Sequence, residues 1–127
     1  MKHTRLPLLL YLLNASLLLT HEIDSAYWQE WNLFGLPGGI QFFLVLNFLL
    51  VAVAFYGFSE VIKGTRAGAI CSLILAAAGL FAFSIHTYFL LTGHPEFRLP
   101  ASLIILAATL LVSVAQAILV ISVLRKQ

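Results

Sequence analysis

Two histidines and one aspartate stand out because they fall within or directly after otherwise apolar stretches. His21 and Asp24 are three residues apart, a spacing that places both side chains on one face of a helix. His86 lies in a separate apolar stretch. Ionisable side chains at membrane depth are costly, and by default they indicate a functional site. The sequence therefore predicts a polar site built from His21, Asp24 and His86.

Imidazole and carboxylate groups together are ligands for divalent metals. Mixed nitrogen and oxygen donors suit zinc, non-haem iron or manganese, and an open coordination position would let a bound water react. We expect a metal site that hydrolyses or oxidises a lipid-like substrate, with Glu22 or His94 as an auxiliary ligand. Three further polar side chains are expected to hydrogen-bond to the ligand side chains and orient them: Gln41, Tyr27 and Asn14.

Other interpretations use the same histidines. His21 and His86 on facing helices could ligate a haem iron, although the neighbouring carboxylates disfavour a haem pocket. Histidine beside carboxylates is also typical of a proton relay, but no continuous ionisable path follows. The remaining alternative is a non-catalytic accessory or oligomer-forming membrane subunit, in which these groups only join helices. The sequence contains no Ser/His/Asp nucleophile arrangement and no phosphate-binding glycine loop.

The composition is that of a membrane protein. Of 127 residues, 61% are apolar and 9% are charged, and the mean hydropathy is +1.01. Soluble domains carry roughly a quarter charged residues, so a soluble globular domain, a disordered tail and a nucleic-acid binder are excluded. The lone Cys71 excludes an intramolecular disulfide or a cysteine-based zinc site. We expect one transmembrane domain over residues 1–127.

Four helical spans are expected, over about residues 6–26, 40–61, 67–91 and 101–124. Crossing the bilayer takes roughly 20 helical residues. The first apolar stretch is shorter than this, so its helix must continue through His21 and Asp24. We interpret it as a retained helix and not as a signal peptide. Residues 25–34 are expected to form an interfacial amphipathic segment, with Trp28 and Trp31 as membrane-interface anchors.

Small and polar residues mark the faces that pack between membrane helices. They follow one face of the third expected span and a line along the fourth: Gly68, Ser72, Ala76, Gly79, Ala82 and His86, then Ser102, Thr109, Ser113 and Gln116. Short links between the spans favour an all-α, antiparallel four-helix membrane bundle. In that arrangement the first and third spans run in the same direction, so His21 and His86 reach a similar layer.

The basic residues predict the orientation. Six of the seven fall on one side of the four-span layout: Lys2, Arg5, Lys63, Arg66, Arg125 and Lys126. Arg98 falls on the other side. The positive-inside rule then places both termini in the cytoplasm. We expect a multi-pass protein of the bacterial inner (plasma) membrane whose partners are the lipid bilayer, a lipid-like ligand, and a second copy or partner subunit.

Residues 21–31 read HEIDSAYWQEW and residues 36–41 read LPGGIQ. These motifs resemble a family of small bacterial four-span membrane proteins of unknown function. More distantly, they are similar to the HXXEE integral membrane family, in which a His-x-x-Glu-Glu motif opens the chain and later histidines follow. His21 matches the histidine, whereas Asp24 and Ser25 replace the two glutamates. The resemblance implies the fold and a shared histidine and acid feature, and no particular reaction.

Overall fold

The computed structural model describes residues 5–126 and is helical throughout, with no strand in that range. Its elements are α1 (Arg5–Tyr27), α2 (Glu30–Leu33), α3 (Gly39–Lys63), α4 (Arg66–Leu91) and α5 (Pro100–Leu124). The four long helices begin and end close to the bounds expected from the hydropathy pattern. They are long and apolar enough to cross a membrane. The predicted class, an all-α four-helix membrane bundle, is confirmed.

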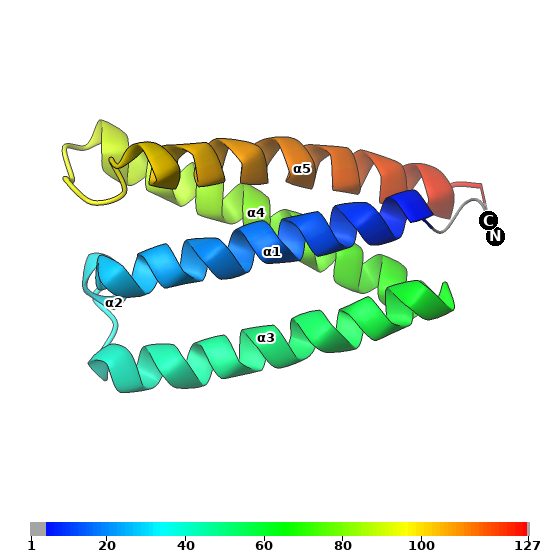
Figure 1. The fold of residues 1–127 in the computed structure, drawn as a ribbon, viewed down its shortest axis with the longest axis horizontal. Coiled ribbons are helices and arrows are strands. Elements are labelled where there is room, and N and C mark those ends of the chain that lie inside the picture. The colour runs from blue at the N-terminus through cyan, green and yellow to red at the C-terminus, as the bar shows by residue number, and fades with distance from the viewer. Residues whose placement is uncertain (1–4, 127) are drawn as a thin grey trace.

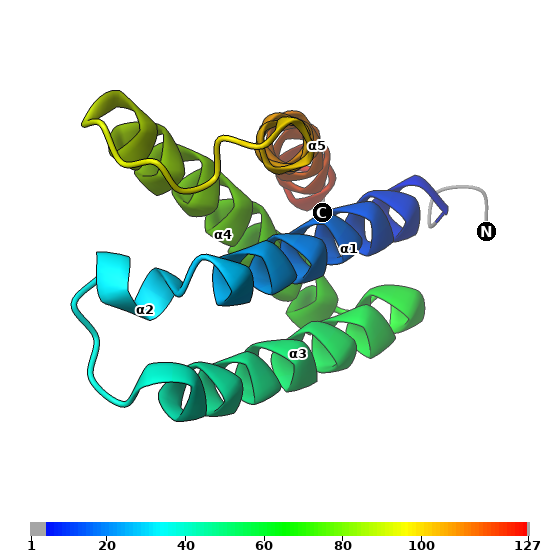
Figure 2. The same cartoon turned by 60° about the vertical axis from the view of Figure 1, so that its left-hand side comes forward.

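The long helices lie side by side and alternate in direction (Figure 1). The described chain begins and ends at one end of the bundle, whereas α2 and the α4–α5 loop lie at the other. Helices α1 and α4 form the central pair, because each contacts the other and both outer helices. Helices α3 and α5 flank this pair and do not contact each other within the described chain (Figure 2).

The interior is lined by small and polar side chains, and large apolar side chains face outward. Every small or polar residue expected to face inward on α4 and α5 is buried. These residues are Gly68, Ser72, Ala76, Gly79, Ala82 and His86 on α4, and Ser102, Thr109, Ser113 and Gln116 on α5. This pattern follows from the solvent. Lipid is as apolar as leucine, so leucine-rich faces gain nothing by packing inward, whereas small residues let helices approach closely.

Two turns set the ends of the helices. The α3–α4 turn places Gly64 in the left-handed region (φ 67°), and the Thr65 hydroxyl then accepts a hydrogen bond from the Gly68 amide at 3.0 Å. At the other end, α1 stops at Tyr27 and Gln29 takes a left-handed conformation (φ 52°) before α2 begins. The amphipathic segment expected over residues 25–34 is therefore divided between the last turn of α1 and the separate α2.

Candidate metal centre

His21, Glu30 and His86 meet at the end of the bundle that carries α2. Each offers one ligand atom, and these atoms lie within 4.8 Å of one another. All three residues are buried, with exposed fractions of 2%, 8% and 1%. Charged and polar side chains are rarely buried to this extent unless they are paired or bind an ion. The cluster could therefore hold a metal ion.

Three helices position the cluster. His21 lies six residues before the end of α1, and His86 lies on the face of α4 that packs inward. Glu30 is the first residue of α2. The left-handed turn at Gln29 redirects the chain, so the Glu30 carboxylate reaches His86. Without this break in the helix, a side chain nine positions after His21 would lie on a different face.

The two imidazole rings are in edge-to-face contact, with centroids 4.5 Å apart and an interplanar angle of 77°. Nε2 of His86 lies 2.8 Å from Oε1 of Glu30. The Ser25 hydroxyl, one turn after His21, lies 3.4 Å from Nε2 of His21. The cluster thus brings three ligand-bearing side chains and one hydroxyl together from segments that are far apart in the sequence.

Several ring nitrogens in this cluster have no hydrogen-bond partner. Among the described residues, Nδ1 of His21 and both ring nitrogens of His86 are buried without a directed hydrogen bond. His86 Nε2 is close to the Glu30 carboxylate, but the contact does not have hydrogen-bond geometry. Nearly all buried polar groups in proteins are hydrogen-bonded, and each exception calls for an explanation. Coordination of a metal ion by these nitrogens would be one such explanation.

The neighbours of Glu30 favour the charged form of its carboxyl. Burial raises its pKa, but contacts with the His86 imidazole and the Ser25 hydroxyl lower it, and the net pKa lies below the usual value. A carboxylate that stays ionised is the form that binds a cation. The electrostatics of the site therefore agree with the choice of Glu30 as a ligand.

Phe97 covers the cluster from the α4–α5 loop. Its ring centroid lies 4.1 Å from that of His86 and 5.7 Å from that of His21. The residue is 1% exposed and has a positive φ of 64°. A bulky residue in this region is uncommon and marks a strained backbone. The loop therefore inserts an apolar ring above the imidazoles and separates them from the outside.

The donor set could serve a divalent metal ion. Two imidazoles and one carboxylate are the ligands of many zinc and non-haem iron centres, and three protein ligands leave a position open. A tetrahedral ion with bonds of about 2.1 Å holds its ligand atoms about 3.4 Å apart. Atoms now within 4.8 Å would need to move only slightly closer. A bound ion could then polarise a water or an oxygen of a substrate.

The structure brings together two of the predicted ligands, His21 and His86, and adds Glu30. Asp24, Glu22 and His94 are not part of this group. Asp24 has one buried carboxylate oxygen without a hydrogen-bond partner among the described residues. Glu22 lines a cavity of about 130 Å³ between α1, α3 and α4. His94 is half-buried in the α4–α5 loop, with Nδ1 3.8 Å from Glu96.

The residues expected to support the ligands lie elsewhere. Asn14 is fully buried and donates hydrogen bonds to Gln116 and Ser113 of α5. Gln41 and Tyr27 are exposed. The role of Asn14 in the described structure is to join α1 and α5, two helical turns from His21.

The two tryptophans expected at the membrane interface are half-buried. Trp28 contacts the ring of Phe97, with centroids 6.3 Å apart, and Trp31 contacts Phe43, with centroids 5.3 Å apart. Both therefore pack against the end of the bundle that carries the cluster. Their role as membrane anchors stays a prediction.

Two residues at this end of the bundle, Glu30 in the cluster and Phe97 above it, are not predicted by the sequence analysis. On a continuous helix over residues 25–34, Glu30 would point away from the aromatic face of the segment. Its acidic type inside an aromatic-rich, apolar segment was the available indication. Phe97 gave no indication, because its position depends on a positive φ that the sequence His-Pro-Glu-Phe-Arg does not specify.

Comparison with known proteins adds the family. Neither the curated proteins nor the solved structures contain a match to this chain. The sequence profile of one family matches residues 8–123, which include all of the cluster and nearly all of the four long helices. The match agrees with the expectation that the chain belongs to a family of unknown function. The similarity to the HXXEE family stays a prediction. The chain belongs to this family, described as a family of unknown function (DUF6713).

Proposed function

We propose that the protein binds one divalent transition-metal ion through His21, Glu30 and His86. The observation that carries the proposal is the buried meeting of His21, Glu30 and His86 ligand atoms within 4.8 Å of one another, with Nδ1 of both histidines lacking a hydrogen-bond partner among the described residues. Zinc, iron or manganese suits this donor set. The ion would satisfy the nitrogens and neutralise the carboxylate, and the position not filled by protein would take water or substrate.

The metal centre is proposed to lie at the extracytoplasmic side of the bacterial inner membrane. The support is the charge distribution, since Arg5, Lys63, Arg66 and Arg125 gather at the opposite end of the bundle. Basic residues near membrane spans favour the cytoplasmic side. Both termini would then be cytoplasmic, as the sequence predicts.

A lipid-like substrate is the class that we propose for the metal centre. The cavity between α1, α3 and α4 is lined mainly by apolar side chains, and its polar lining residues include Glu22 and Asn47. Such a cavity suits the tail of an amphiphile. Glu22 follows His21 directly in α1, so a substrate with its tail in the cavity would carry its polar group toward the cluster. Hydrolysis or oxidation of that group is the proposed chemistry.

The test is the metal content of the purified protein. We would measure it by mass spectrometry in detergent for the wild type, H21A, H86A and E30Q. E30Q is the sharpest variant because it keeps the size of the side chain and removes the charge. Its matched control is D24N, which makes the same chemical change one turn after His21 but outside the cluster. H94A is the corresponding control for histidine.

Near-stoichiometric metal in the wild type, D24N and H94A, with loss in the three cluster variants, is the expected result. Loss in D24N with retention in E30Q would contradict Glu30 as a ligand and favour Asp24. No metal in any sample would contradict the proposal and favour a non-catalytic accessory or oligomer-forming subunit. An absorption band typical of haem would instead support bis-histidine haem ligation by His21 and His86.

A further inference from the structure

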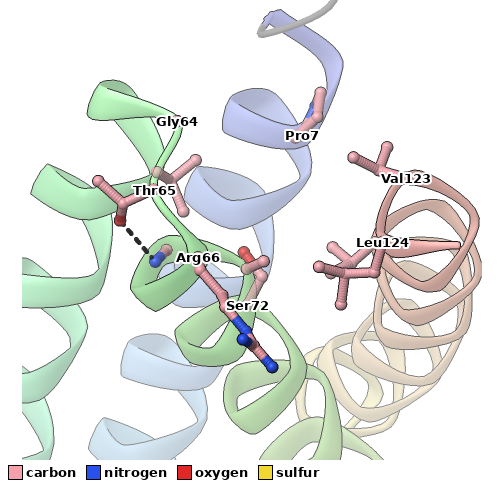
Figure 3. A pocket seen from close by; sticks show the side chains of 11 residues that line it. Pro7, Gly64, Thr65, Arg66, Ser72, Val123 and Leu124 are labelled. Atoms are coloured by element: carbon pink, nitrogen blue, oxygen red, sulfur yellow. Dashed lines mark hydrogen bonds between the residues drawn. The ribbon is translucent and has the colours of Figure 1, made fainter. Parts of the chain in front are cut away.

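A second candidate site lies at the opposite end of the bundle from the metal centre. A cavity of about 240 Å³ opens between α1, the α3–α4 turn, α4 and α5, and side chains from all four surround one space (Figure 3). From these features we infer that the cavity binds the phosphate-bearing headgroup of an anionic phospholipid, with Arg66 as the principal contact. The inference does not depend on the metal centre, because the two sites share no residue.

Arg66 is the cation that lines this cavity. Within the described chain it takes part in no ion pair and no side-chain hydrogen bond, and it is exposed. Its neighbour Lys63 differs, because Nζ of Lys63 lies 2.6 Å from the Glu60 carboxylate. The cavity therefore contains a guanidinium group whose five N–H donors are available. Guanidinium binds phosphate oxygens in a bidentate manner, with strong, charge-assisted hydrogen bonds.

Ser72 supplies a second, independent polar group. It lies two turns into α4, lines the cavity and is only 2% exposed. No hydrogen bond from its hydroxyl to another residue between 5 and 126 is found, so the hydroxyl can donate to a ligand in the cavity. The hydroxyl and the guanidinium are thus two donors without partners that border the same space.

The remaining walls are apolar, which suits a lipid better than a free anion. They come from three helices and include Pro7, Val61, Val120, Val123 and Leu124. The cavity lies near the ends of the spans, where headgroups would meet acyl chains in a bilayer. A phospholipid could place its phosphate beside Arg66 and the apolar part of its glycerol ester region against these walls. A free phosphate ion would leave the apolar walls without a partner.

The charge around the cavity favours an anionic lipid. Arg5 and Arg125 lie at the same end of the bundle, as does Lys126. Basic pockets between helices at the cytoplasmic side of membrane proteins are typical binding sites for anionic headgroups, and each basic residue near the surface strengthens the attraction. These basic residues would attract a zwitterionic lipid less strongly than an anionic one.

The test is lipid binding by native mass spectrometry of the full-length protein in detergent. Phosphatidylglycerol and phosphatidylcholine with identical acyl chains would be compared in about 0.15 M salt, where charges farther apart than about 8 Å are screened. We expect preferential binding of phosphatidylglycerol by the wild type. R66Q should lower its affinity about tenfold, because charge-assisted hydrogen bonds are lost. R125Q removes the same charge at the same end but outside the cavity, so it should lower the affinity less than R66Q does.

Two further measurements keep the proposal falsifiable if one variant folds poorly. A69L would narrow the cavity without changing charge, because Ala69 lines it, and it should also weaken phosphatidylglycerol binding. Inorganic phosphate should not displace the lipid. Equal losses in R66Q and R125Q, an unaltered preference in both R66Q and A69L, or displacement by inorganic phosphate would each overturn the proposal.

Discussion

The ring of Phe97 lies against the ring of His86, with centroids 4.1 Å apart. Phe97 reaches this position with a positive φ, in a loop that Arg98 ties to α4 through a hydrogen bond to the Leu90 carbonyl at 2.7 Å. Strained residues persist only where the surrounding structure determines them, and they cluster at functional sites. The loop thus holds Phe97 over the histidines, and the backbone at Phe97 is strained as a result.

The first prediction concerns this strain. F97A should destabilise the protein by about 3 kcal/mol, because a buried aromatic ring is lost. F97G loses the same ring but should be more stable than F97A by about 1 kcal/mol, because glycine adopts a positive φ without strain. Unfolding by denaturant in detergent would measure both values.

Phe89 provides the matched control, because it is buried within α4 at a helical position. There the order should be reversed, and F89G should be less stable than F89A by about 1 kcal/mol. If the alanine variant is more stable than the glycine variant at Phe97 as well as at Phe89, the backbone at Phe97 is not strained.

Removal of the proposed metal ion should destabilise the wild type. A ligand that binds only the folded state contributes about 2.7 kcal/mol when its concentration is 100 times its dissociation constant. Addition of a chelator should therefore lower the unfolding temperature of the wild type and of D24N. E30Q, which lacks one ligand, should not respond. An equal response of E30Q and the wild type would mean that the chelator acts elsewhere.

Gly79 should not accept even one methyl group. It lies where α4 meets α5, and a Cβ atom there would collide with the Ser113 hydroxyl. G79A should therefore destabilise the bundle by about 1–3 kcal/mol despite the higher helix propensity of alanine. The additional S113A substitution should restore part of the loss, since it removes the colliding oxygen. A more stable G79A protein would contradict this packing.

Asn14 and Gln116 should be energetically coupled. Nδ2 of Asn14 lies 2.6 Å from Oε1 of Gln116. A double-mutant cycle with N14L and Q116L is expected to give a coupling energy of about 0.6–1.7 kcal/mol, the range found for hydrogen bonds between membrane helices. Asn47 is the control, because its side chain bonds to the Phe43 carbonyl within its own helix. The stability losses of N14L and N47L should be additive. A coupling energy between them as large as that of Asn14 and Gln116 would show that the coupling does not come from the direct hydrogen bond.

The orientation is tested by labelling single cysteines after Cys71 has been replaced by alanine. A membrane-impermeant maleimide added to spheroplasts should label P95C, in the α4–α5 loop, because the positive-inside rule places this loop outside. It should label K126C only after the membrane has been permeabilised. The reverse pattern would place the cluster on the cytoplasmic side.

The spans and their inward faces could be predicted because they depend on local composition. Hydropathy identifies a span, and small residues at helical spacing identify its packed face. The meeting of His21 and His86 followed from counting residues along two helices of the same direction. The position of Glu30 could not be predicted in this way. It depends on a left-handed glutamine between two helical segments, a conformation that no local pattern specifies.

The order of the ligands along the chain has a consequence for biogenesis. Two of the three proposed ligands, His21 and Glu30, belong to the first span and the short helix that follows it. The third, His86, is synthesised only after all of α3 and most of α4. A nascent chain that has inserted only its first helix therefore carries an incomplete centre. Loading of the ion would mark the moment at which α4 has docked against α1.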